Sequence, residues 1–124
     1  MFDGNGKFET QWQNLHRPCG LCMPYGRQPI FYVGEVGPAA AVSRDIPNLG
    51  PRVSIVDRQG KLLGRFGDPA GTELGKFLAP HGLAVDSRGD VYVGEVSWTA
   101  WPQIYPGKPH PADLRSLQKF EKVG

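Results

Sequence analysis

The sequence predicts an all-β protein built from a repeated four-stranded unit, and three observations lead to this. Residues 15–36 and 78–98 follow one plan, and both contain the pentapeptide Tyr-Val-Gly-Glu-Val. A frame of apolar-Asp-x-x-Gly-Lys-apolar occurs at 2–8 and at 56–62, and residues 120–124 enter the same frame again. Glycine (17 residues) and proline (12 residues) separate short apolar runs along the chain. Self-similarity with a period of this size is typical of a repeat array.

Runs of β-branched and aromatic residues, bounded by turn residues, divide each repeat into short strands. No segment has convincing helical periodicity, and "PADLRSLQKF", which comes nearest, aligns with a strand of the first repeat. We expect strands at residues 20–23, 30–36, 52–56 and 61–66 in the first repeat, at 82–85, 90–96 and 116–120 in the second, and at 7–12 before them.

Four antiparallel strands that recur with this period describe the blade of a β-propeller. We expect an outer strand of a preceding blade in residues 1–12, a complete blade in 13–66 and a blade without its outermost strand in 67–124. Two blades alone would expose strand edges and an apolar flank to water. Either the chain is a fragment of a longer propeller, or copies assemble. In a homotrimer, 7–12 of one copy would pair with 116–120 of the next to close a six-bladed ring.

Composition excludes several classes of protein. The 14 basic and 12 acidic residues give a net charge of +2 and are scattered along the chain, so we expect no nucleic-acid partner. Mean hydropathy is −0.36, and we expect neither a membrane span nor a membrane partner. The amino-terminal residues lack the basic start and apolar run of a secretory signal, so the sequence indicates a cytoplasmic protein unless it is truncated.

Long connections are expected to gather at one end of each blade. In an up-and-down meander, successive loops alternate between the two ends of the sheet. The short turns at 57–60 and 86–89 therefore share one end, and the long connections share the other. Loops much longer than a hairpin needs are usually functional or disordered. The long connections comprise residues 37–51, 67–81 and 97–115.

His81 ends one long connection and begins the innermost strand of its blade. A residue at that position is expected near the ring axis, at the mouth of the central channel. Cys19 occupies the equivalent position in the preceding blade. We therefore expect His81 and Cys19 to point to one face. The alternative for His81 is a structural role, in which its ring hydrogen-bonds to the loop backbone.

The repeat resembles that of the NHL-repeat propellers. The stretch "FLAPHGLAVDSRGDVYVGEV" is similar to the family's inner strands, and "VSIVDRQGKLLGRFG" is similar to its outer hairpin. The resemblance covers most of the chain outside residues 37–51 and 97–115, and it implies a six-bladed ring. Glu35 and Glu95 stand where the family usually has aspartate, so the acidic class is kept.

The element "PHGLA" at 80–84 is similar to one in the peptidyl-α-hydroxyglycine α-amidating lyases, which are NHL-like propellers with axial histidines that hold zinc. This resemblance implies that His81 is a zinc ligand, with Cys19 as a second candidate. Calcium is the other candidate metal, and no nucleotide cofactor is expected. The implied activity is a metal-dependent lyase of the peptidylamidoglycolate type with a small or peptide-like ligand, although no catalytic residue can be assigned. The alternative is a non-catalytic propeller scaffold that binds another protein.

The remaining candidates have both a functional and a structural interpretation. We expect a structural role within the repeat for the acidic residues that end matching strands and for the glycines of the inner strands. The aromatic residues of the last insertion either line a pocket or fix a long loop, and the loop histidines either reach the ligand face or are solvated. The repeat residues are Glu35, Glu95, Gly20 and Gly82, and the candidates for the ligand face are Trp98, Trp101, Tyr105, His110 and His16.

Overall fold

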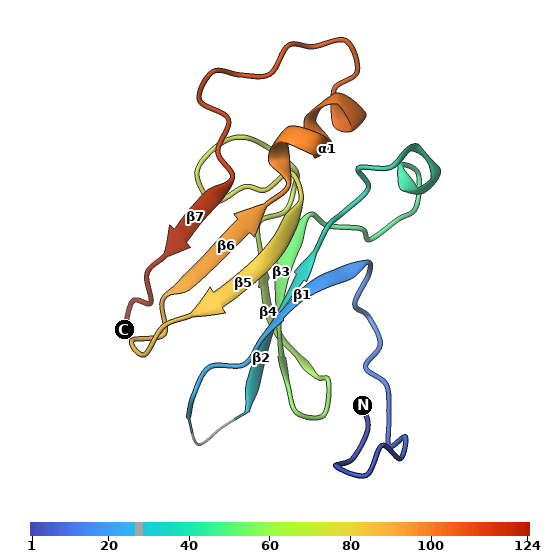
Figure 1. Cartoon of the computed structure of the whole chain (residues 1–124), viewed down its shortest axis with the longest axis vertical. Helices are drawn as coiled ribbons and strands as arrows, with labels where there is room; N and C mark the ends of the chain where they lie inside the picture. Colours follow the sequence, from blue (N-terminus) through green and yellow to red (C-terminus); the bar gives the residue numbers. More distant parts are fainter. Residues whose placement is uncertain (27–28) are drawn as a thin grey trace.

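The computed structural model describes residues 1–26 and 29–124 and contains two antiparallel sheets (Figure 1). The first sheet has four strands in the order β1-β2-β3-β4, and the second has three in the order β5-β6-β7. The predicted all-β class is confirmed as a mostly β structure. The strands are β1 (Pro18–Cys22), β2 (Ile30–Glu35), β3 (Arg52–Asp57), β4 (Leu62–Phe66), β5 (Pro80–Val85), β6 (Val91–Glu95) and β7 (Leu117–Phe120). Residues 27–28, in the predicted turn of the first blade, lie outside the described residues.

The two sheets share one register. Gly20 pairs with Gly34 in the first sheet, and Gly82 pairs with Gly94 in the second. In both sheets the inner strand has a bulge immediately before its paired glycine. A β-bulge inserts one residue and changes the direction of its side chain. The backbone thus repeats residue for residue, as the alignment of the two segments predicts.

The connection after β6 contains a helix, which corrects the expectation that no segment is helical. Helix α1 spans Ser97–Ile104 and includes Pro102, and a short 3-10 helix spans Ala41–Ser43 in the connection after β2. Eight residues give too few turns for a clear period, and proline inside the segment argues against a helix. Among the residues that the structure describes, no helix is long and apolar enough to cross a membrane.

The three turns that carry the Asp-x-x-Gly frame have the same geometry. In each, one carboxylate oxygen of Asp3, Asp57 or Asp86 accepts hydrogen bonds from the backbone N–H groups two and four residues later, at 2.9–3.0 Å. The glycine three residues after each aspartate has a φ between 80° and 90°, a region that favours glycine. The frame is therefore a turn signal with a physical cause.

The first residues form a hairpin like the one between β3 and β4. Phe2 bridges Phe8 around the Asp3 turn, as Val56 pairs with Leu62 around the Asp57 turn. The strand predicted over residues 7–12 does not extend beyond this bridge. A strand needs a neighbour for its ladder, and within the described part of the chain only Met1 bonds to this segment beyond the bridge, through the N–H of Glu9 and the carbonyl of Thr10.

The two sheets pack face to face around one apolar core. Strands β1 and β5 approach closely at Gly20, where a Cβ atom would lie 2.5 Å from the carbonyl oxygen of His81. Only glycine permits this approach of backbone to backbone. The core comprises the buried residues Val53, Phe77, Val91 and Val93, with Tyr32, Phe66, Leu83, Val85 and Phe120 packed against them.

The long connections lie together at one end of the molecule. Figure 1 shows α1 and the 3-10 helix at the upper end, and the short β3–β4 and β5–β6 turns at the lower end. A second apolar cluster of Ala39, Ala79 and Ala100 joins the three connections there, and Arg44 donates a hydrogen bond to the carbonyl of Gln103 at 3.0 Å. We call this region the insertion end.

Candidate functional site

Cys19 and His81 occupy matched positions at the insertion end. Each is the residue between the two partners that define the bulge, at the start of the first strand of its sheet. The strands that carry them, β1 and β5, lie side by side (Figure 1). The thiol of Cys19 donates to the carbonyl of Pro80, the residue before His81, at 2.8 Å. Two chemically active side chains therefore begin neighbouring first strands of the two sheets.

The surroundings of the Cys19 thiol favour its protonated form. Burial raises its pKa above the ordinary value of 9.0, although the Gly20 N–H and the charge of Arg17 oppose this. A second carbonyl, that of Gly34, lies 3.4 Å from the sulfur. Zinc binds the thiolate, and two carbonyl acceptors favour the S–H group instead. Cys19 must therefore lose these contacts and its proton before it can bind a metal.

The described residues do not form a zinc site by themselves. A catalytic zinc takes three protein ligands and keeps one position for water or substrate. Across residues 1–26 and 29–124, no group of three His, Cys, Asp or Glu side chains is placed to hold a metal ion. His81 and Cys19 are at most two donors, so a metal at this end needs a further ligand.

Glu35 is at the centre of a buried polar network. Its side chain has no exposed surface, and Arg52, which is 4% exposed, donates to both carboxylate oxygens, at 3.1 and 3.0 Å. The hydroxyl of Ser54 donates to one oxygen, and the backbone N–H of His16 donates to the other at 2.8 Å. The carboxylate is fully engaged in holding β2, β3 and the segment that leads into β1, which is a structural role.

Glu95 has the same structural role in the second sheet, with different hydrogen-bond partners. One oxygen accepts the backbone N–H groups of Leu78 and Ala79, at 2.7 and 3.1 Å, and the other lies 3.3 Å from the side-chain amide of Gln118. Leu78 is the repeat equivalent of His16. Each glutamate therefore fixes the segment just before the Cys19 or His81 bulge, and so positions that residue.

Sequence reasoning missed the basic half of the first network. Arg52 is the first residue of the third predicted strand, and it pairs with Glu35, the last residue of β2. In an antiparallel meander these two positions are opposite one another, so the sequence did contain a signal for the ion pair. The second repeat has Ser116 at the place of Arg52, which hides the pattern when the repeats are aligned.

We expect the first network to make stability depend on acid pH. Burial alone raises the pKa of Glu35, but the hydrogen bonds from Arg52, Ser54 and the His16 N–H, together with the Arg52 charge, outweigh it and hold the pKa below the ordinary 4.5. Because the folded pKa is the lower one, its contribution to stability is complete above 4.5 and is lost as pH falls through the folded value. Urea unfolding followed between about pH 7 and about pH 3 measures this.

Glu35→Gln is the control for this pH dependence, since every other carboxylate is common to both proteins. We expect the variant to be less stable near neutral pH and to lose less stability on acidification. Parallel pH profiles for the two proteins would assign the acid dependence to other groups.

His110 completes the hydrogen bonds of α1. Pro102 has no N–H, so the helix carbonyl four residues earlier, that of Trp98, lacks its usual donor. Nε2 of His110 lies 2.9 Å from that carbonyl oxygen, and its ring stacks on Trp98 with the centroids 4.3 Å apart. Since a carbonyl only accepts, Nε2 is the donor. His110 therefore has a structural contact, and Trp98 remains 57% exposed.

Trp101 fixes the rest of the insertion to α1. It is 8% exposed, and its indole N–H donates to the carbonyl of Lys108 at 3.0 Å. Tyr105 packs on its ring with the centroids 4.4 Å apart. These contacts correspond to the interpretation in which the aromatic residues hold a long loop. Trp98 is the member of the group that offers its surface to a ligand.

His16 is also engaged in contacts within the chain. Its backbone N–H is bound by Glu35, and its ring Nε2 lies 3.2 Å from the side-chain amide of Asn48. The ring is only partly buried, so it keeps some access to solvent. Of the three histidines, His81 is the one whose side chain is exposed.

Comparison with known proteins leaves the family open. No protein-family model matches the chain, and no curated protein matches it significantly.

Proposed function

We propose that the chain supplies two neighbouring blades of an NHL-like β-propeller, whose insertion end binds a small or peptide-like ligand together with a metal ion. The observation that carries the proposal is the matched position of Cys19 and His81 at the start of adjacent inner strands. In a propeller the inner strands surround the axis, so residues at that position from successive blades converge on one site.

His81 is the residue we propose as the main metal ligand. Its side chain is exposed, and an imidazole is a common ligand for zinc. Cys19 is the weaker donor because its pKa is raised, which disfavours the thiolate, and its sulfur is bound to a carbonyl. The remaining ligands would come from outside the described residues. The resemblance to amidating lyases makes cleavage of a peptidylamidoglycolate the reaction class to test.

A second candidate function is a non-catalytic scaffold for another protein. It is favoured by the exposed Trp98 on α1, since tryptophan is enriched in the contact centres of protein interfaces. The engaged positions of His16, His110 and Trp101 also favour it, because they leave few free polar groups at the insertion end. Metal binding distinguishes the two functions.

We expect His81→Ala to lower zinc affinity by at least about tenfold and to leave the melting temperature unchanged. The exposed ring contributes no packing to the core. Elemental analysis and equilibrium dialysis with zinc measure the first effect, and thermal unfolding measures the second. His110→Ala is the matched control, which should keep the metal and loosen α1. A His81→Ala protein with unchanged zinc and reduced stability would give His81 the structural role, and wild-type protein without zinc or calcium would favour the scaffold.

A further inference from the structure

The two sheets of the chain are joined through unlike faces. Leu83 of β5 lies over Gly20 and Gly34 of the first sheet, where added Cβ atoms would each be 3.5 Å from its side chain. We call the side of a sheet that carries this leucine its front face, and the side that carries the two glycines its back face. The front face of the second sheet thus packs on the back face of the first.

Each sheet also has the other kind of face, and there the leucine or the glycine pair is not covered by the partner sheet. Leu21 is the front-face leucine of the first sheet, and it is 65% exposed. Gly82 and Gly94 are the back-face glycines of the second sheet. A Cβ atom at Gly82 would meet nothing within 4 Å, and one at Gly94 would meet only the carbonyl oxygen of Gly82, at 3.8 Å. The molecule therefore presents one free leucine and one free glycine pair.

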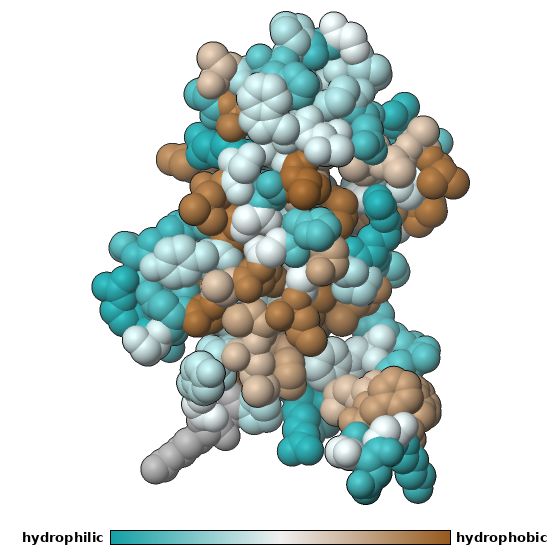
Figure 2. All heavy atoms as spheres, viewed as in Figure 1, coloured by the Kyte–Doolittle hydropathy of each residue, from teal (hydrophilic) through white to brown (hydrophobic). Residues whose placement is uncertain are grey.

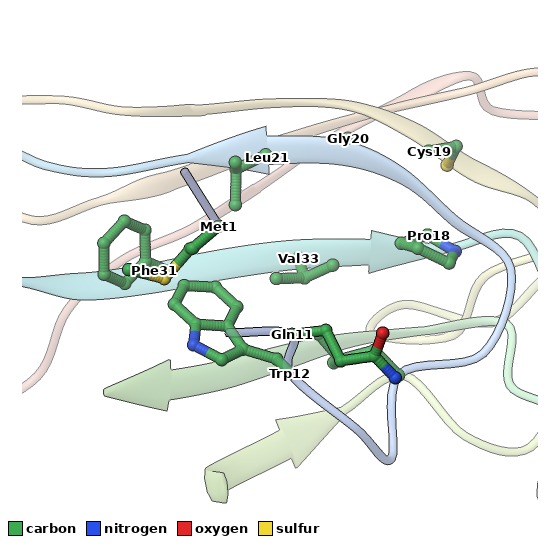
Figure 3. A pocket seen from close by; sticks show the side chains of 10 residues that line it. Met1, Gln11, Trp12, Pro18, Cys19, Gly20, Leu21, Phe31 and Val33 are labelled. Atoms are coloured by element: carbon green, nitrogen blue, oxygen red, sulfur yellow. The ribbon is translucent and has the colours of Figure 1, made fainter. Parts of the chain in front are cut away.

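Each of these faces offers exposed apolar surface, and the back face of the second sheet also carries Lys119 over the ring of Tyr92. The front face of the first sheet borders an open hollow of about 570 Å³ beside Leu21 (Figure 3). Farther from β1 the amino-terminal segment already covers this face, since Val33 is 3% exposed and Trp12 packs on Phe31 with the ring centroids 4.8 Å apart. On the back face of the second sheet, Leu117 pairs with Gly94 and is 65% exposed. Figure 2 shows apolar residues gathered in the middle of the view, where β1, β2 and β5 lie in Figure 1.

We propose that the occupant of the front face of the first sheet is the back face of the second sheet of another copy of this chain. The interface inside the chain is the template, since it already joins the same two kinds of surface through the same leucine and glycine positions. Because the faces are unlike, the contact is head to tail, and each added copy presents the same free faces again until a ring closes.

The amino-terminal hairpin lies beside the front face of the first sheet. The hairpin of residues 2–8 has the turn that joins β3 to β4, and Met1 and Trp12 beside it line the hollow at the front face. A copy that packs on the front face would therefore contact this hairpin as well as Leu21. This inference rests on the repeat and does not depend on the proposed function.

The test blocks one face at a time. Leu21→Asp places a charge on the front face, and Gly82→Val fills the back face where a neighbour's backbone would approach. Leu74→Asp and Gly64→Val are matched controls, since Leu74 is 82% exposed and a Cβ at Gly64 meets nothing within 4 Å. Sedimentation velocity over a range of concentrations gives the size of each protein, and circular dichroism verifies that each is folded.

We expect wild type and both controls to associate as concentration rises, and each face variant to remain a monomer. Mixing the two face variants is the decisive step. The intact front of Gly82→Val can bind the intact back of Leu21→Asp, so the mixture should form a dimer of one chain each and nothing larger. A wild-type protein that stays monomeric at every concentration overturns the proposal, as does association that both face variants retain or a mixture that forms no dimer.

Discussion

Arg52→Ala is expected to lower the free energy of unfolding by about 3–5 kcal/mol. The reason is that Glu35 has no exposed surface, so removal of its nearer cation leaves a buried carboxylate with only Arg65, whose Nε lies 4.0 Å away, as a counter-charge. Arg52 also donates to Asn48 and lies 3.4 Å from the carboxylate of Asp68, so the change opens the start of β3 as well. The free energy of unfolding of a folded domain is roughly 5–15 kcal/mol in total, so the variant should be close to unfolding. Urea denaturation at neutral pH and a fixed low concentration measures the loss.

The second sheet provides the control for this prediction. It holds its glutamate without arginine, with Ser116 and Gln118 at the places of Arg52 and Ser54. Transfer of that arrangement, as Arg52→Ser with Ser54→Gln, supplies an amide donor to Glu35. We expect this double variant to be more stable than Arg52→Ala. A loss below about 1 kcal/mol for Arg52→Ala, the size typical of an exposed ion pair, would contradict the assigned burial.

The strands and their order could be predicted because the chain repeats itself. Each repeat tests the other, and the shared Tyr-Val-Gly-Glu-Val segment determines the register of both sheets. The Asp-x-x-Gly frame marked the turns for a local reason, since the aspartate side chain and a glycine with positive φ suffice to make them. The equivalence of Cys19 and His81 followed from the same alignment.

The insertions could not be predicted in this way because they have no counterpart in the other repeat. Helix α1 depends on a contact across the insertion, in which His110 supplies the hydrogen bond that Pro102 cannot. Neither residue indicates a helix by itself. The network around Glu35 was missed for a related reason, since the two repeats satisfy the same buried glutamate with different partners, and an alignment shows only what they share.

Leu83→Asp should prevent the chain from folding. Leu83 packs against the core between the two sheets and fills the space over Gly20 and Gly34. The substitution removes that apolar contact. It also places a carboxylate against apolar side chains and the glycine backbone of the first sheet. Together these effects cost on the order of 4 kcal/mol or more, which is a large share of the stability of a small domain. Circular dichroism should show loss of β structure at room temperature.

Leu21→Asp is the matched control, and the comparison tests the packing of the repeat directly. Leu21 has the same place in the register, the same strand type and the same preceding glycine, but its side chain is 65% exposed. At low concentration a charge at that position remains in water, so we expect a change within about 0.5 kcal/mol. The two substitutions are chemically identical, so any difference between them comes from what covers each leucine. If both variants unfold, the front face of the first sheet is covered even in the monomer. If both fold normally, the two sheets do not pack through Leu83, and the core described above would be wrong.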